Sequence, residues 1–320
     1  MSQSGHIRVA LLGATGTAGR ATAQALLARG HSVTAFGRTD PRIAGLKARA
    51  CDLTQPGALE AAMAGHPGFE AMISCLASRS GAPTEAWAID HAAHVTALEA
   101  AQSHGIGHFV MLSALCVQKP RLAFQHAKLA FEERLIASGL RYSIVRPTAF
   151  FKSLSGQIAR VKEGRPFLVF GDGRGTACKP ISDRDLGAFI ADCLDTQAHW
   201  NAVLPIGGPG PAITPMDQAE MLALLLGRPV RLRRVPHGVM DAIIAGLSVA
   251  GRISAKAATK AELARIGRYY AREAMLVWDA EAGRYDAEAT PETGKDLLIE
   301  HYEKVLRGEV EVDLGAHALF

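Results

Sequence analysis

Three glycines near the start of the chain have a spacing that could bind a phosphate. Gly13, Gly16 and Gly19 follow a short apolar run and open an Ala/Leu-rich segment. Glycine is needed where a backbone turns tightly or approaches a pyrophosphate, and the first turn of a helix offers that anion free N–H groups. The pattern predicts a dinucleotide site that uses Gly13, Thr15, Gly16, Thr17 and Gly19. The alternative is a turn that only packs a helix on a sheet.

An arginine stands at the end of the second predicted strand, where NAD sites carry an acidic residue for the ribose 2′-hydroxyl. The strand ends in Phe36-Gly37-Arg38, and Asp40 comes two residues too late for that role. The Arg38 guanidinium suits a 2′-phosphate by its charge and by its fork of donors. The sequence therefore favours NADPH over NADH. The alternative is that Arg38 is an ordinary surface arginine.

Further cofactor contacts are expected at the ends of later strands. Asp52 and Leu53 follow the third predicted strand and are placed to flank the adenine. Residues 74–77 end the fourth strand and are placed to line the nicotinamide, and Ser113 ends the fifth. The contacts predicted from these strand ends and the helix that follows are Cys75, Leu76, Ala77, Ser113, Lys128 and Pro147.

The expected catalytic tyrosine is missing. The Gly-x-x-Gly-x-x-Gly spacing resembles that of extended and atypical short-chain dehydrogenases. Those short-chain dehydrogenases that move hydride to a carbonyl use a Tyr-x-x-x-Lys pair. None of the five tyrosines has a lysine four residues later, and Phe124-Gln125-His126-Ala127-Lys128 stands at the expected place. Carbonyl chemistry and sugar epimerisation are therefore disfavoured. Hydride delivery to a carbon–carbon double bond, or no chemistry at all, fits better. Lys128 is kept as a candidate, with a solvated helix lysine as the alternative.

No metal or disulfide site is expected. His91 and His94 lie three residues apart on a predicted helix without a further spaced acid or thiol, so we interpret them as surface histidines. The five cysteines are widely spaced and never form a Cys-x-x-Cys pair. A zinc knuckle or disulfide framework is therefore not predicted, and a reducing compartment fits best. Cys178 is interpreted as a packing residue.

Alternating strand-like and helix-like segments must position these residues. Helices are expected over residues 17–29 and 84–104. Short apolar runs predict strands over residues 7–12, 32–36, 71–76, 108–115 and 141–145, in addition to the third strand that ends before Asp52. Short buried strands that alternate with helices indicate an α/β fold with a doubly wound parallel (Rossmann) sheet.

The second half of the chain has clear helix starts. Ser182-x-x-Asp185 is typical of a capping box, and Thr214-Pro215 predicts a helix that ends at Gly227. Thr290-Pro291 predicts the start of a last helix in the same way. We expect an NADP-binding domain over residues 1–150. Residues 151–320 are expected to form a smaller lobe that covers the substrate, with some elements packed on the sheet.

Composition excludes several classes of protein. The chain has 320 residues, and its 48% hydrophobic and 21% charged residues exclude wholesale disorder. A net charge of +4 is too small to argue for a nucleic-acid partner. The polar start, Met1 to His6, lacks an apolar signal core, and the apolar segment 239–251 is too short to span a membrane. A soluble cytoplasmic protein is expected.

Longer strings in the sequence carry a more specific resemblance. They are Ser74–Arg79, Trp87–Asp90, Leu112–Pro120, Tyr142–Leu154, Phe170–Gly173, Cys178–Ser182, Leu204–Gly210 and Arg265–Tyr270. With them the chain resembles the NADPH-dependent divinyl chlorophyllide a 8-vinyl reductases of plants and phototrophic bacteria, from Ile7 to Phe320. The start lacks the transit peptide of the plant members, so a bacterial form is expected.

The resemblance implies reduction of the 8-vinyl group of a divinyl chlorophyllide or protochlorophyllide to ethyl with NADPH, in chlorophyll or bacteriochlorophyll biosynthesis. A vinyl group conjugated to a macrocycle accepts a hydride because the ring spreads the resulting charge, so loss of the tyrosine is tolerable. A proton must still arrive. Lys128, one of the Tyr269/Tyr270 pair, or a water could deliver it, and Lys128 and Tyr269 are the candidate catalytic residues.

A planar tetrapyrrole needs a wide apolar slot with a few polar anchors. Phe150, Phe151 and Leu154 are placed to line such a slot, and Lys152 is placed to meet a propionate. Core packing is the alternative for the phenylalanines. The apolar segment from Val239 to Gly251 is expected to cover the macrocycle, to touch the photosynthetic membrane, or to be a buried helix. Membrane contact is expected to be peripheral at most.

Two other functions fit the same residues. A redox-sensing or assembly protein of the isoflavone-reductase-like kind would hold NADP(H) without turnover, and the missing tyrosine keeps this alternative open. The second alternative function is that of a different ene or quinone reductase. The 8-vinyl reductase and the other ene or quinone reductase would each oxidise NADPH when their acceptor is present, whereas the binding protein would leave NADPH unchanged.

Overall fold

The computed structural model describes residues 5–312, and its internal contacts divide the chain into two units. The first unit holds residues 5–78 together with Pro83–Pro147 and Asp183–Pro205. The second holds Arg79–Ala82, Thr148–Ser182 and residues 206–312. Asp183–Pro205 is thus a segment of the C-terminal half that groups with the first unit. The division of the chain at residue 150 stays a prediction. The substrate-covering role of residues 151–320 stays a prediction.

A seven-stranded sheet forms the centre of the first unit, in the order β3-β2-β1-β4-β5-β6-β8. Neighbouring strands from β3 to β6 pair in parallel, with Arg8 opposite Ser32 and Val9 opposite Ala71. The strands are β1 (Arg8–Leu12), β2 (Ser32–Gly37), β3 (Lys47–Ala50), β4 (Ala71–Ser74), β5 (His108–Leu112), β6 (Arg141–Pro147) and β8 (Ala202–Ile206). This order confirms the predicted Rossmann sheet.

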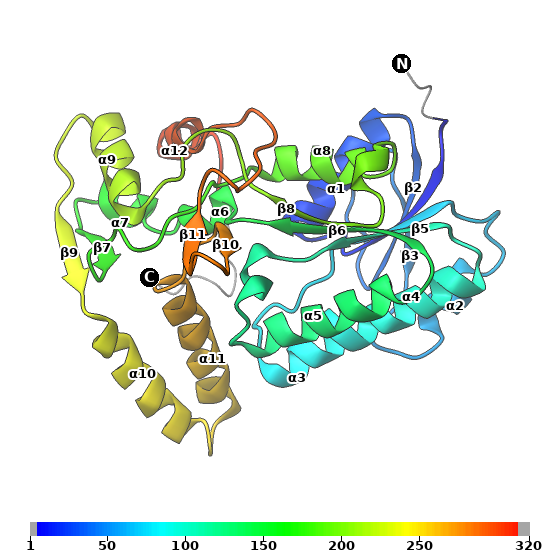
Figure 1. Cartoon of the computed structure of the whole chain (residues 1–320), viewed down its shortest axis with the longest axis horizontal. Helices are drawn as coiled ribbons and strands as arrows, with labels where there is room; N and C mark the ends of the chain where they lie inside the picture. Colours follow the sequence, from blue (N-terminus) through cyan, green and yellow to red (C-terminus); the bar gives the residue numbers. More distant parts are fainter. Residues whose placement is uncertain (1–4, 313–320) are drawn as a thin grey trace. The chain divides into compact units, whose positions relative to one another are not determined.

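Helices cover both faces of this sheet, as Figure 1 shows. One face carries α1 (Thr17–Ala28) and α8 (Asp183–Asp192). These two helices approach so closely that a Cβ on Gly187 would lie 2.5 Å from the Ala21 carbonyl carbon. The other face carries α2 (Ala58–Met63), α3 (Pro83–Ala86), α4 (His94–Ser103) and α5 (Ala123–Ile136). The remaining short helices of this unit are the π-helix η1 (Trp87–Ala93) and the 3₁₀ turns η2 (Leu115–Gln118) and η3 (Gln197–His199).

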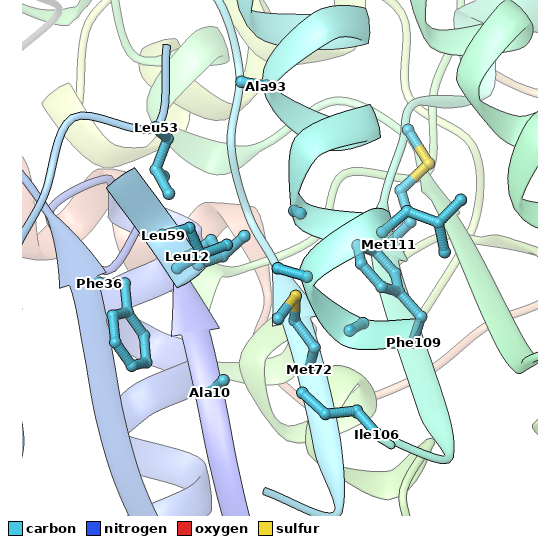
Figure 2. Close-up of a cluster of buried hydrophobic side chains, with 14 of the residues drawn as sticks. Ala10, Leu12, Phe36, Leu53, Leu59, Met72, Ala93, Ile106, Phe109 and Met111 are labelled. Carbon is cyan, nitrogen blue, oxygen red and sulfur yellow. The ribbon is translucent and has the colours of Figure 1, made fainter. Parts of the chain in front are cut away.

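One core cluster of the first unit lies between the sheet and the α2–α5 layer, and the opposite face of the sheet is also buried. Figure 2 shows side chains of this cluster projecting from neighbouring strands, among them Leu12, Phe36, Met72 and Phe109. All four are at most 1% exposed. Strands buried in this way carry runs of apolar residues rather than an alternation, which is why the sequence predicted them. The core fixes the carboxyl ends of the strands, where the predicted cofactor contacts lie.

The second unit contains two small sheets and six helices within the described residues. β7 (Phe167–Phe170) pairs in parallel with β9 (Leu232–Val235), and β10 (Val277–Asp279) forms an antiparallel hairpin with β11 (Arg284–Asp286). Its core surrounds the buried side chain of Tyr302. The helices are α6 (Phe151–Leu154), α7 (Ile158–Lys162), α9 (Pro215–Leu226), α10 (His237–Ala250), α11 (Ala255–Tyr270) and α12 (Leu298–Arg307).

Two of the predicted helix starts have different outcomes. Thr214 caps α9 by accepting a hydrogen bond from the Asp217 N–H, and Gly227 ends the helix with φ +61°, as predicted. The prediction of a helix start at Thr290 was wrong, because the last helix begins at Leu298. The Thr290 hydroxyl instead donates to the Asp286 carbonyl and accepts from the Val277 N–H. It therefore holds the β10–β11 hairpin rather than a helix.

Within residues 5–312, the helices are too short or too polar to cross a bilayer.

Candidate nucleotide-binding and catalytic site

The glycine turn between β1 and α1 has the geometry of a phosphate cradle. Gly13 has φ +79°, and a Cβ there would lie 2.7 Å from the Cys75 carbonyl carbon. A Cβ on Gly19 would lie 2.2 Å from the Gly13 carbonyl oxygen. Both glycines are therefore required by the protein itself, because no side chain fits at either position.

Gly16 is different, and it supplies the test of fit for a nucleotide. It has φ −74° and ψ 162°, which any residue adopts, and a Cβ there would meet nothing closer than the Gly13 carbonyl oxygen at 3.5 Å. Gly16 is also the N-cap of α1, and it brings no side chain to the helix N-terminus. Thr15 and Thr17 beside it are exposed. The cradle thus leaves open the space that a pyrophosphate would occupy at the start of α1.

Arg38 and Asp52 lie together beyond the ends of β2 and β3. Arg38 is exposed directly after β2. Hydrogen bonds from Thr54 to the Asp52 carboxylate lower the pKa of Asp52, and the nearby Arg38 charge lowers it further. Asp40 accepts a hydrogen bond from the Arg42 N–H at 2.7 Å, so its carboxylate stabilises its own turn. The two residues predicted for the adenosine end are therefore neighbours.

The end of β4 lies beside the glycine turn. Cys75 is close to Gly13, as described above, and its Sγ lies 3.7 Å from Thr22 Oγ1 on α1. Desolvation raises the pKa of the Cys75 thiol to about 12, so it stays protonated at neutral pH. Leu76 is half-buried against the core and Ala77 is exposed. Leu53, by contrast, is buried in the core cluster of Figure 2.

Lys128 forms a buried ion pair that no sequence pattern indicated. Its Nζ lies 3.1 Å from Asp90 Oδ1, and the two side chains are only 6% and 1% exposed. The Asp90 carboxylate also faces the Ser78 N–H at 3.4 Å. The positive charge of Lys128 partly opposes the rise in the pKa of Cys75, which burial causes. The alternative of a solvated helix lysine was wrong.

Asp90 owes its position to an unusual backbone. It lies in η1, a seven-residue π-helix between α3 and α4, and its carboxylate lies against α5 through Lys128. π-Helical turns are rare in proteins, and those that occur are frequently found at functional sites. The signal that could have found Asp90 is its isolation, since it is a single acidic residue between Ile89 and the apolar positions Ala92 and Ala93. A buried carboxylate requires a partner.

His94 is part of the same buried region, so the interpretation of it as a surface histidine was wrong. Its Nε2 lies 2.9 Å from Ser74 Oγ, and its Nδ1 lies 2.9 Å from the Ile89 carbonyl. Because that carbonyl only accepts, Nδ1 carries the proton and the Ser74 hydroxyl donates to Nε2. Burial, and then the charge of Lys128, lower the pKa of His94 to about 4. The ring is therefore neutral and fixes the end of β4.

Ser113 belongs to a second buried network. Its hydroxyl donates to the Glu132 carboxylate, which also accepts hydrogen bonds from the Arg146 guanidinium. Glu132 lies one turn after Lys128 on α5 and is 2% exposed. Ser113 directly follows β5 and the buried Pro147 ends β6, but the Ser113 hydroxyl is committed to Glu132. The cofactor contact of Ser113 therefore stays a prediction, and Glu132 and Arg146 are residues that sequence reasoning missed.

The predicted substrate residues lie in the second unit. Phe151 is 4% exposed and packs in the core of that unit, with its ring 5.4 Å from the His301 ring. Phe150, Lys152 and Leu154 are half-buried. Tyr269 is buried near the end of α11, with its ring 5.5 Å from that of Tyr270. The burial of Phe151 agrees with the packing alternative. The substrate roles of Phe150, Phe151, Lys152 and Leu154 and the catalytic role of Tyr269 stay predictions.

Comparisons with known proteins cover nearly the whole chain. A family model described as NAD(P)H-binding matches residues 13–197, which confirms the predicted class of cofactor. The divinyl chlorophyllide a 8-vinyl-reductase of Oryza sativa subsp. indica is 47% identical over 98% of this chain and 82% of the rice protein. The chain belongs to the divinyl chlorophyllide a 8-vinyl-reductase family. The resemblance seen in the sequence is thereby confirmed.

More distant similarities correspond to the alternatives. The photosystem II assembly factor Ycf39 of Cyanophora paradoxa is 27% identical over 73% of this chain and 73% of that protein. The crystal structure of the Escherichia coli quinone oxidoreductase QOR2 with NADPH has a TM-score of 0.68 at 18% identity, covering 93% of this chain and 99% of that chain. This structural likeness shows the shared fold.

Several strings that resemble the 8-vinyl-reductases have a structural explanation. A Cβ on Gly208 would lie 1.9 Å from the Pro180 carbonyl oxygen, so the strings around residues 178–182 and 204–210 pack backbone against backbone. The string Trp87–Asp90 begins the π-helix and supplies the Lys128 partner. Some of the residues that carry the 8-vinyl-reductase resemblance therefore fix the local backbone or a buried ion pair.

Proposed function

We propose that the protein reduces the 8-vinyl group of a divinyl chlorophyllide or protochlorophyllide to ethyl, with NADPH as the reductant, in chlorophyll or bacteriochlorophyll biosynthesis. The observation that carries the proposal is 47% identity to a divinyl chlorophyllide a 8-vinyl-reductase over 98% of the chain. The geometry of the first unit is consistent with it. Phe124 stands one helical turn before Lys128, where carbonyl-reducing relatives of this fold have tyrosine.

The first unit would hold the nucleotide at its pyrophosphate and at the 2′-phosphate of its adenosine. The open space at Gly16 and the N-terminus of α1 suit the pyrophosphate. Arg38 would bind the 2′-phosphate through its charge and its fork of donors, next to Asp52. When bound, NADPH supplies a hydride, and the strand ends at Cys75, Leu76 and Ala77 would border its nicotinamide.

Lys128 is assigned two roles in this proposal. Its ammonium would contact the nicotinamide ribose of a bound NADPH and would supply the proton that completes the ethyl group. Asp90 holds the ammonium in place from the π-helix at 3.1 Å. The conjugated macrocycle spreads the charge left by hydride addition, so one positioned proton donor is sufficient and a tyrosine hydroxyl is not required.

The substrate contacts are proposed for the second unit. Phe150 and Leu154 are half-buried and would provide apolar surface for a planar ring, and Lys152 would pair with a propionate carboxylate. We place the reaction in the cytoplasm, with membrane contact that is peripheral at most.

The direct test is anaerobic incubation of the purified protein with divinyl chlorophyllide a or divinyl protochlorophyllide, with NADPH and NADH in parallel, followed by pigment chromatography. A monovinyl product with NADPH is expected. Protein that binds NADPH but leaves both pigments and the nucleotide unchanged would favour the non-catalytic binding function. Oxidation of NADPH with a quinone but with neither pigment would favour a different reductase.

A further inference from the structure

The helical hairpin formed by α10 and α11 has an apolar face that the described part of the chain leaves uncovered. α10 is built almost entirely from apolar and small residues, yet only Met240 and Ile244 of its 14 residues are buried. Val249 is 64% exposed and Ile253, in the turn between the two helices, is 93% exposed. The segment is therefore not the buried helix that the sequence analysis kept as an alternative.

The exposed apolar residues lie on one side of α10. Val239, Ala242, Ile243, Gly246 and Val249 are spaced three or four residues apart, so they form one stripe along the helix. All five are exposed, and no charged residue interrupts the stripe. The stripe continues into the turn at Ile253. We call these residues and the turn the hairpin face.

The polar groups of α10 point the other way, toward α11. Asp241 forms ion pairs with Arg268 at 2.7 Å and with Arg272 at 2.8 Å, and the Arg265 guanidinium donates to Ser248 Oγ at 2.7 Å. These contacts hold the two helices side by side, as Figure 1 shows. The hairpin thus satisfies its charges between its helices and turns its apolar side outward.

The charge around the turn indicates what covers the hairpin face. Residues 242–261 contain no Asp or Glu, but they include Arg252, Lys256 and Lys260. All three are exposed and lie at or near the turn. An apolar helix face beside exposed basic residues is the pattern by which amphipathic segments lie on a bilayer that contains anionic lipids.

We propose that the hairpin face docks this protein on an anionic lipid bilayer. The apolar stripe enters the boundary between headgroups and acyl chains, and Arg252, Lys256 and Lys260 contact lipid phosphates. Such contact is peripheral, in agreement with the short length of both helices. The proposal does not depend on the reductase activity, because it concerns lipid rather than pigment.

The test is sedimentation of the full chain with vesicles, in the absence of pigment and nucleotide. Vesicles of phosphatidylcholine alone are compared with vesicles that also contain phosphatidylglycerol, each at low and high salt. Binding to the anionic vesicles that weakens with salt is expected. The variant Val249→Glu/Ile253→Glu should lose at least about tenfold in binding. Lys256→Ala/Lys260→Ala should lose about 30-fold, at roughly 1 kcal/mol per charge.

Leu224→Glu is the matched control, because Leu224 is 73% exposed on α9, outside the hairpin. It should bind vesicles like the unmodified chain. Absence of binding to anionic vesicles, or equal binding by all variants, would overturn the proposal. If the unmodified chain does not bind vesicles but forms a dimer, and Val249→Glu/Ile253→Glu is a monomer, the hairpin face would be assigned to contact with a second copy. Unchanged vesicle binding with reduced pigment turnover would assign it to the substrate.

Discussion

The glycine turn at residues 13–19 and the buried pair of Lys128 and Asp90 lie in the same unit but are built in opposite ways. The turn is set by neighbouring residues in the chain, where a positive φ at Gly13 and a close approach at Gly19 exclude any side chain. The pair joins two residues 38 positions apart, on a π-helix and on α5. Local backbone requirements leave a pattern in the sequence, whereas a tertiary ion pair leaves two unremarkable residues.

The largest expected effect is a loss of turnover when Lys128, one member of the buried pair, is replaced. Lys128→Arg retains a cation beside Asp90 but replaces the ammonium with a guanidinium, which is not deprotonated in proteins and so cannot act as the proton donor. We expect kcat to fall by about 10²- to 10⁴-fold, the usual contribution of general acid catalysis. Binding of NADPH, measured by fluorescence titration, should change little. Lys128→Ala should lose both turnover and affinity.

Tyr269→Phe is the companion variant, because Tyr269 is the other candidate donor. Its turnover should stay close to that of the unmodified protein. Near-normal turnover by Lys128→Arg, combined with loss of turnover in Tyr269→Phe, would move the proton donor to Tyr269.

Removal of the Asp90 charge should mainly affect stability. Asp90→Asn leaves the Lys128 ammonium buried without a counter-charge, which costs about 3–5 kcal/mol for pairs of this kind. The free energy of unfolding from urea titration measures the loss. Glu99→Gln is the control, since Glu99 pairs with Arg134 in an ion pair whose side chains are more than half exposed. That control should lose less than about 1 kcal/mol. Equal losses would mean that the buried pair is no more important than a surface pair.

The glycine turn can be tested by two matched alanine variants. Gly16→Ala fits the backbone and meets no protein atom closer than 3.5 Å, so the protein should fold normally. The added methyl group enters the space assigned to the pyrophosphate. An extra methyl group in a filled space costs about 1–3 kcal/mol, so nucleotide affinity should fall roughly 10- to 100-fold. Gly19→Ala, with its contact at 2.2 Å, should destabilise the fold itself. Unchanged nucleotide affinity in Gly16→Ala would place the pyrophosphate elsewhere.

Arg38 should give the smallest and most selective effect. Arg38→Asp removes a charged hydrogen-bond donor from the 2′-phosphate, which corresponds to about a tenfold loss of NADPH affinity or somewhat more. The affinity for NADH should hardly change. Arg49→Asp, at an exposed position on the neighbouring β3, is the control. If Arg38→Asp weakens both nucleotides equally, the assignment of the 2′-phosphate to Arg38 is wrong.

The fold and the glycine turn could be predicted because their causes are local. Apolar runs such as residues 7–12 and the glycine spacing act through neighbouring residues, and the structure places both as expected. Thr290 was mispredicted because its hydroxyl finds partners in the β10–β11 hairpin instead of at a helix start. A sequence pattern cannot distinguish those two uses of one hydroxyl group.

The buried polar residues could not be predicted for the same physical reason. His94 and Asp90 occupy positions that would be exposed on an isolated helix, and only packing against β4 and α5 removes them from water. Ser113 was expected to face the cofactor, yet Glu132 on α5 takes its hydroxyl. Each of these contacts joins elements that are distant in the sequence.

The most direct test of the account is to follow the hydride. NADPH deuterated at C4 of the nicotinamide, on each face in turn, is incubated with divinyl chlorophyllide a, and the monovinyl product is analysed by mass spectrometry. With deuterated NADPH in ordinary water, we expect one deuterium in the new ethyl group, and only when one of the two faces carries the label. With unlabelled NADPH in D₂O, we expect one deuterium from the solvent in the same ethyl group. A monovinyl product that takes up deuterium only from the solvent would contradict direct hydride transfer to the vinyl group.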